Sequence, residues 1–191
     1  MNMELIAAFK DSAQAREVAM NLNGTLYVDE REKTDHLPFA ALVSAQTDEL
    51  AALVDTADVG TYLVCRRIIK PRQGEDVRSG QLPGIIGLFT MVANSNMGPQ
   101  DADQHWRDNH APLALEVHKA MSFYYQLSVQ HVFKGPDWNG FAMCGFDNID
   151  DLRHRFFATP EGERAIAVDV AKFSDGKRSP RRTLAVESRF W

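Results

Sequence analysis

The side chains best suited to catalysis lie close together, in the stretch from His105 to Ala114. On a helix, Trp106, His110 and Leu113 follow spacings of four and three, and so share one apolar stripe. Desolvation on such an inward face suppresses the charged form of a histidine and keeps its pKa in the range useful for proton transfer. His110 is therefore the candidate general acid/base. The same spacing also fits a core histidine that is hydrogen-bonded to a carbonyl.

Pro112 lies two residues after this histidine. It has no N–H to donate to the carbonyl of Asp108, so we expect the helix to kink or restart just after His110, where the ring can face a cavity. His105 shares a more polar face with Asp101 and Asp108. That spacing fits a solvated helix face better than a metal site, and we expect neither a metal nor another cofactor.

A second group of polar side chains follows on the segment 123–131, which alternates as a strand does. One face carries hydroxyl and amide groups, from Tyr124, Gln126, Ser128 and Gln130. If this face lines a cavity, it can orient a ligand; if it faces water, the segment is an ordinary amphipathic strand. His118 and His154 lie in charged surroundings and are expected at the surface.

The elements that must position these residues follow one order twice. Residues 4–69 and residues 87–190 each read β-α-β-β-α-β, and the charged, Gly-containing stretch 72–83 is the expected linker. We therefore expect an α+β protein of tandem ferredoxin-like units, 1–71 and 84–191, with antiparallel sheets and helices on one face. One mixed sheet without repetition is the alternative.

Composition excludes several other classes. The chain has 191 residues, 45% apolar and 25% charged, as folded domains have. A net charge of −5 argues against a general nucleic-acid or anionic-membrane partner, and the basic run 177–182 has no interleaved aromatic residue. No apolar stretch is long enough to cross a membrane, and the acidic N-terminus lacks the basic region of a signal peptide. With only Cys65 and Cys144, we expect a cytoplasmic protein.

Several sequence features together resemble one family. They are the helix Trp106-x-x-x-His110-Ala111-Pro112-Leu113-Ala114, the strand Tyr124-Tyr125-Gln126, the strand Gly140–Asp147 ending in Phe-Asp, and Pro160-Glu161-Gly162 followed by Asp169-x-x-x-Phe173. By these features, about residues 84–191 resemble the EthD-type family of the dimeric α+β barrel (ferredoxin-like) superfamily. Residues 1–83 match no motif, but their element order suits a degenerate second copy of the same fold.

The resemblance implies a cavity between the sheet and its helices that takes small, largely apolar molecules. Related families include cyclases and dehydratases of aromatic polyketides, lactone isomerases, cofactor-independent monooxygenases and haem-binding enzymes. By analogy the family's histidine corresponds to His110, and Trp106 lines the pocket. Where the family often has a second histidine, this chain has Ser128, and His131 has the opposite strand parity.

From the sequence we expect a cofactor-independent lyase or isomerase, of cyclase or dehydratase type, that acts on a small apolar carbonyl or aromatic compound. His110 is the expected acid/base. The expected substrate-binding residues are Trp106, Tyr124, Gln126, Ser128 and Phe146. We also expect a homodimer. The alternatives are a non-catalytic protein that binds a small hydrophobic ligand and a haem-binding member of the superfamily.

Overall fold

The computed structural model describes residues 2–31, 34–74, 79–180 and 182–191, so part of the expected linker 72–83 and one residue of the basic run 177–182 lie outside the described residues. In the first half the elements are β1 (Asn2–Phe9), α1 (Ser12–Asn21), β2 (Thr25–Asp29), β3 (Ala41–Ala45), the 3-10 turn η1 (Thr47–Glu49), α2 (Leu50–Thr56) and β4 (Gly60–Lys70). In the second half they are β5 (Gly80–Gln81), β6 (Ile85–Met91), α3 (Pro99–His105), η2 (Trp106–His110), α4 (Ala111–Val117), β7 (Phe123–Lys134), β8 (Gly140–Phe146), α5 (Ile149–His154), α6 (Pro160–Phe173) and β9 (Thr183–Arg189).

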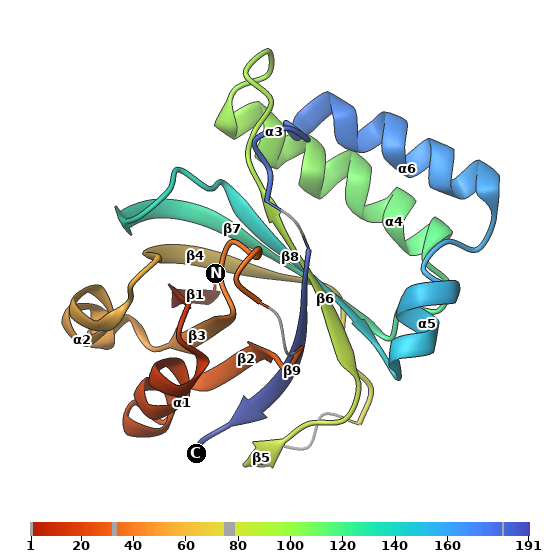
Figure 1. The fold of residues 1–191 in the computed structure, drawn as a ribbon. Coiled ribbons are helices and arrows are strands. Elements are labelled where there is room, and N and C mark those ends of the chain that lie inside the picture. Colours follow the sequence, from red (N-terminus) through yellow and green to blue (C-terminus); the bar gives the residue numbers. More distant parts are fainter. Residues whose placement is uncertain (1, 32–33, 75–78, 181) are drawn as a thin grey trace.

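The strands form a closed antiparallel barrel within one chain (Figure 1). The strand order is β2-β3-β1-β4-β7-β8-β6-β9, and β2 pairs with β9 to close the ring. The short strand β5 pairs with the last residues of β9. Each half contributes its four long strands in the same order, second-third-first-fourth, and the seams are β4–β7 and β2–β9. The α+β class is confirmed, and barrel closure does not require a second copy of the chain.

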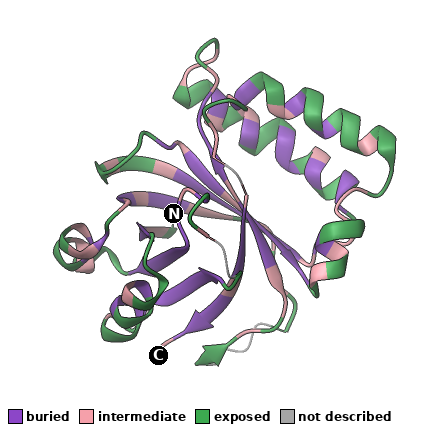
Figure 2. Ribbon diagram, viewed as in Figure 1, coloured by how far each residue is buried: buried purple, intermediate pink, exposed green. Residues whose placement is uncertain are grey.

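Strand alternation divides the apolar residues into an inner and an outer set. In β1, Ile6 and Ala8 point into the barrel, whereas Leu5 and Phe9 point outward to the helices. The barrel interior is filled by packed aromatic rings, from Phe39, Tyr62, Trp138 and Phe141, with centroids 5.4–6.4 Å apart. The helices cover the outside of the barrel and bury the face toward the strands (Figure 2). A cavity can therefore lie in an outer layer or at the open end of the barrel, where Tyr27 and Arg66 line a hollow.

The two outer layers differ. In the first half, α1 and α2 pack on outward-facing residues such as Leu5, Phe9 and Leu26, all of which are fully buried. In the second half, the helix pair α3–α4 and α6 covers the sheet of β6, β7 and β8 (Figure 1). No helix among the described residues is long and apolar enough to span a membrane.

The expected helix break after His110 is replaced by a π-helical turn. The N–H of Ala111 donates to the carbonyl of Trp106, five residues earlier, and α-helical geometry resumes at once through Val117. In a π-turn an N–H donates to the carbonyl five residues earlier, and not to the one four residues earlier as in an α-helix. The ring of Pro112 is therefore accommodated without ending the helix. Such turns occur frequently at functional sites.

Candidate active site

A cavity of about 340 Å³ lies between the second-half sheet and its helices. This volume is at the lower end of the range of small-molecule pockets. The wall is mostly apolar and aromatic, with contributions from Phe89, Phe156, Phe157 and Phe173. Polar chemistry comes from His110, His118 and Tyr124, and from the hydroxyls of Thr90, Ser174 and Ser179. The cavity is therefore suited to a flat, mostly apolar molecule with a few polar groups.

His110 is held by an acidic residue that the sequence did not identify as functional. Its Nδ1 lies 2.9 Å from Asp169 Oδ2 on α6, and His105 Nε2 lies 2.8 Å from the other carboxylate oxygen. Phe173 packs on both imidazole rings, with centroids 5.1 and 5.4 Å away. Because α6 comes about sixty residues later in the chain, only the fold brings Asp169 to the histidines.

This contact determines the tautomer of His110. The Asp169 carboxylate accepts the Nδ1 proton, so Nε2 is the basic nitrogen, and it has no hydrogen-bond partner within the described ranges. Burial lowers the pKa of His110 below its ordinary value and outweighs the opposing contact with Asp169. Burial acts to raise the pKa of Asp169, but the hydrogen bonds from both histidines hold it below its usual value. A neutral imidazole beside an ionised carboxylate is the state expected of a general base near neutral pH.

Tyr124 is arranged as a hydrogen-bond donor to the cavity. Its hydroxyl oxygen accepts from Trp106 Nε1 and from Gln126 Nε2, each at 3.1 Å. Both lone pairs are then occupied, and no acceptor for the hydroxyl proton is found among the residues that the structure describes. Burial raises the pKa of Tyr124 well above its usual value, so the hydroxyl keeps its proton.

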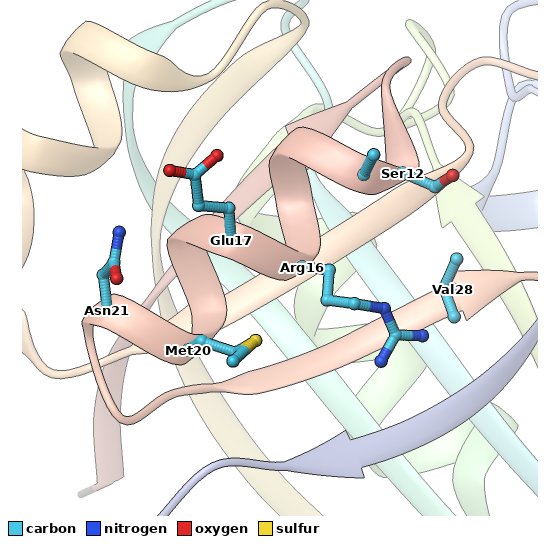
Figure 3. A pocket seen from close by; sticks show the side chains of 7 residues that line it. Ser12, Arg16, Glu17, Met20, Asn21 and Val28 are labelled. Carbon is cyan, nitrogen blue, oxygen red and sulfur yellow. The ribbon is translucent and has the colours of Figure 1, made fainter.

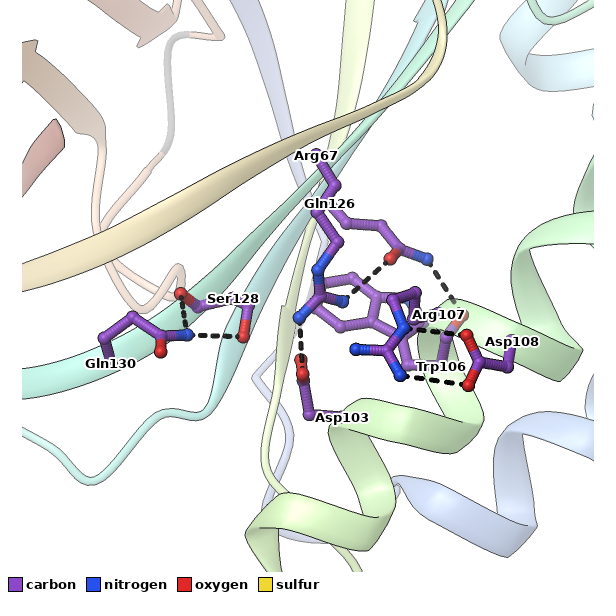
Figure 4. A network of polar contacts seen from close by, with 8 residues as sticks. All are labelled: Arg67, Asp103, Trp106, Arg107, Asp108, Gln126, Ser128 and Gln130. Atoms are coloured by element: carbon purple, nitrogen blue, oxygen red, sulfur yellow. Dashed lines mark hydrogen bonds and ion pairs between the residues drawn. The ribbon is translucent and has the colours of Figure 1, made fainter. Parts of the chain in front are cut away.

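Gln126 lies behind the cavity wall and orients this tyrosine. Its Nε2 also donates to the Trp106 carbonyl at 3.0 Å, and its Oε1 accepts from Arg67 at 3.2 Å. Arg67 can only donate and a carbonyl can only accept, so the orientation of the amide is determined. Arg67 also pairs with Asp103 of α3, which ties the helix to β4 (Figure 4).

The structure brings together some of the residues expected in the site and separates others. Trp106, His110 and Tyr124 line the cavity, and Gln126 supports two of them from behind. Ser128 does not line the cavity and instead accepts from Gln130 at 2.9 Å (Figure 4). Two residues add about 7 Å along a strand, which carries Ser128 past the helices.

Phe146 also lies outside the wall. Its ring packs behind Phe156, with centroids 5.6 Å apart, in the apolar layer that supports the cavity. The alternation of β7 was predicted correctly. Which residues along each strand reach the cavity depends on where the helices cross the sheet, and sequence periodicity carries no such information.

His118 is buried and lines the cavity, so the expectation of a surface residue is wrong. Its Nδ1 donates to the Phe156 carbonyl at 2.7 Å, and its ring contacts those of Phe156 and Phe157. Burial lowers the pKa of His118 below its ordinary value. Its position eight residues after His110, two helical turns on, is a signal that could have placed both on one face.

Other candidates carry less chemistry. Cys144 lines the cavity, but burial raises its pKa to about 12, so it is an apolar thiol and not a nucleophile. A separate depression lies over α1 and β2, where Arg16, Glu17 and Met20 lie along the exposed helix surface (Figure 3). No group of His, Cys, Asp and Glu that could hold a metal ion occurs within the described part of the chain.

Residues 94–177 match the family model of the EthD domain, so the resemblance that its motifs indicated is confirmed over this part of the chain. No curated protein matches the chain. The crystal structure of an anthrone oxidase-like protein resembles it over 98% of this chain and 92% of its own, with a TM-score of 0.58 and 8% identity. That of a candidate monooxygenase from Lactobacillus acidophilus NCFM covers 99% and 93%, with a TM-score of 0.45 and 6% identity.

These comparisons correct the expected reaction class. The sequence led us to expect a cofactor-independent lyase or isomerase, whereas a structure with this fold is described as anthrone oxidase-like. The lyase or isomerase prediction is therefore wrong. The matches give no support to a non-catalytic ligand-binding protein or to a haem-binding one.

Proposed function

We propose that this protein oxidises a small, flat, enolisable aromatic ketone of the anthrone type with dioxygen. The observation that carries the proposal is the pairing of His110 with Asp169, which leaves a basic Nε2 at an apolar cavity that also contains the Tyr124 hydroxyl. An anthrone has a methylene group that is acidified by two aromatic rings and a conjugated carbonyl. The described anthrone oxidase-like structure with this fold makes it the first substrate to test.

In the proposed reaction, His110 Nε2 removes a proton from the methylene group while Tyr124 donates a hydrogen bond to the carbonyl oxygen, where negative charge develops. The carbanion reduces dioxygen, a C–O bond forms, and His110 returns the proton to give a hydroperoxide. His110 then removes the second methylene proton as the O–O bond breaks, and hydroxide leaves with a proton as water. In balance, one dioxygen molecule converts the methylene group to a carbonyl group and releases one water molecule.

Residues that hold His110 and Tyr124 in place have positioning roles in this proposal. Asp169 keeps the His110 proton on Nδ1 and stabilises the imidazolium that forms in each proton transfer. Gln126 and Trp106 hold the Tyr124 oxygen, so that its proton points to the substrate. Phe146 and Ser128 support the surrounding layers and do not contact the substrate.

Oxygen uptake with anthrone tests the proposal. We expect oxygen consumption and quinone formation well above the uncatalysed background. His110→Asn keeps an amide N–H near the position of Nδ1 and removes Nε2, so it should lower the rate by about 10²- to 10⁴-fold. His154→Asn, at an exposed histidine on α5, is the matched control and should leave the rate unchanged. Equal rates in the wild type and His110→Asn, or no uptake above background, would overturn the proposal.

We also infer that residues 1–71 and 84–191, joined by 72–83, correspond to the two units of a dimeric α+β barrel carried on one chain. The identical strand order of the two halves supports this inference, as do the two seams between them. The active site is then complete in a single copy, and the homodimer expected from the sequence is not needed to close the barrel. Full activity of a species that sediments as a monomer is the expected result.

The proposed setting is the cytoplasm, with a small apolar molecule as the partner and no nucleic acid or membrane. Two free, buried cysteines, Cys65 and Cys144, fit a reducing compartment. The acidic net charge of −5 fits the absence of a polyanionic partner.

A further inference from the structure

The orientation of His118 leaves one nitrogen for a ligand. Because a carbonyl can only accept, the contact with Phe156 requires the proton on Nδ1. In the neutral ring, Nε2 is then a hydrogen-bond acceptor, and it has no partner among the residues described. His118 is 4% exposed and lines the cavity, so little bulk water competes for this nitrogen.

The polar groups at the cavity therefore form a simple pattern. Tyr124 offers a hydrogen-bond donor, while His110 and His118 each offer an acceptor nitrogen. The wall also contains the hydroxyls of Thr90, Ser174 and Ser179, which can donate as well as accept, and is otherwise dominated by aromatic and aliphatic side chains. Tyr124 and His110 are occupied in the proposed reaction by the carbonyl oxygen and the acidic C–H group. His118 takes no part in that reaction. If its buried Nε2 had no hydrogen-bond donor in the substrate complex, binding of the substrate would be weakened.

We propose that His118 is a specificity residue whose Nε2 accepts a hydrogen bond from a hydroxyl group on the substrate ring. The inference rests on the proposed function in taking this cavity as the substrate site. It narrows the substrate class to hydroxylated aromatic ketones, in which a phenolic O–H lies apart from the carbonyl. A site that hydrogen-bonds a substrate hydroxyl discriminates strongly against an analogue that lacks this hydroxyl. An apolar pocket discriminates only weakly against an analogue with an added hydroxyl.

Binding of small ketones that are not turned over tests the inference separately from oxidation. The probes are 1-tetralone, its 5-, 6- and 7-hydroxy derivatives and the matching methoxy compounds, with affinities measured by calorimetry. We expect the wild type to bind at least one hydroxy derivative about five- to tenfold more tightly than 1-tetralone. Its methoxy counterpart retains the oxygen but has no proton to donate, and should lose this preference.

The informative variant is His118→Asn. The asparagine amide keeps an N–H near the position of Nδ1, and so can still donate to the Phe156 carbonyl, but it has no group at the position of Nε2. We expect the variant to bind hydroxy and unsubstituted ketones equally well. His154→Asn is the control and should keep the preference. A merely structural role for His118 would weaken all ligands together and leave their ratio unchanged.

Three results would overturn the inference: equal affinities in the wild type, a hydroxyl preference that persists in His118→Asn, or no binding of any hydroxy derivative. These failures are distinguishable from failure of the proposed function. The tetralones lack the doubly activated methylene group of an anthrone, so their binding is measured whether or not the protein consumes oxygen. Loss of oxygen uptake with a retained hydroxyl preference would refute the oxidase and keep the role of His118.

Discussion

At the scale of single residues, the site depends on two neutral histidines whose protons are placed by their neighbours. Asp169 holds the Nδ1 proton of His110, and the Phe156 carbonyl holds that of His118. In both rings burial lowers the pKa, which keeps Nε2 available as a base or acceptor at neutral pH. Neither Asp169 nor Phe156 is close to its histidine in the sequence, so the tertiary structure determines which ring nitrogen carries the proton.

The lowered pKa values predict how stability depends on pH. The unfolded chain binds protons at histidines near pH 6.5, whereas the folded protein resists protonation of His110 and His118. Their contribution to stability is therefore complete above about pH 6.5. It is lost as the pH falls through the lower folded pKa values, by up to about 1.4 kcal/mol per pH unit for each histidine.

Urea unfolding between pH 8 and pH 5 measures this dependence. The free energy of unfolding should decrease toward pH 5 in the wild type, and the decrease should be shallower in His118→Asn, which removes one of the two groups. The lowered pKa of Asp169 does not contribute in this window, because that carboxyl loses its stabilising charge only near and below pH 3.8. A stability that is flat from pH 8 to pH 5 would contradict the burial of both rings.

At the scale of elements, the π-helical turn and strand β8 together position the tryptophan of the site. Trp106 lies at the start of the turn and packs against Gly140, the first residue of β8. A Cβ atom at Gly140 would lie 2.5 Å from the indole ring, closer than a side-chain contact allows. The glycine therefore lets the helix approach the sheet closely enough for Trp106 to reach Tyr124.

Gly140→Ala is predicted to displace Trp106 and weaken the wall of the cavity. Overpacking of this kind costs roughly 1–3 kcal/mol, which urea unfolding measures. The hydrogen bond from Trp106 to Tyr124 should be disturbed, so oxygen uptake with anthrone should fall as well. Gly176→Ala is the control for stability, because nothing lies within 4 Å of a Cβ at that position. Unchanged stability and activity in Gly140→Ala would mean that the close approach has no consequence.

At the scale of the whole molecule, the two halves share one interior. Phe39 and Tyr62 come from the first half, Trp138 and Phe141 come from the second, and their rings pack together inside the barrel. The β2–β9 and β4–β7 seams join the halves on both sides. The cavity lies in the second half, yet its supporting sheet depends on the first.

Phe141→Ala is predicted to destabilise both halves together. Removal of a fully buried aromatic side chain costs roughly 3–5 kcal/mol. Because the interior is shared, far-UV circular dichroism, which reports on both halves, and tryptophan fluorescence should show one coincident transition at a lower urea concentration. All three tryptophans lie in the second half. Separate transitions for the two signals would show that the halves unfold independently.

Local patterns in the sequence predicted the α+β class, the order of the elements apart from the short strand β5, the shared stripe of Trp106 and His110, and the alternation that groups Tyr124 with Gln126. These features follow from the periods of helices and strands and are encoded locally. The pairing of β2 with β9 and the contact of Asp169 with His110 follow only from the folded arrangement. This arrangement also decided that His118 enters the cavity and that Ser128 does not. These contacts join segments distant in the chain, and their geometry depends on how helices cross the sheet, which local periodicity does not specify.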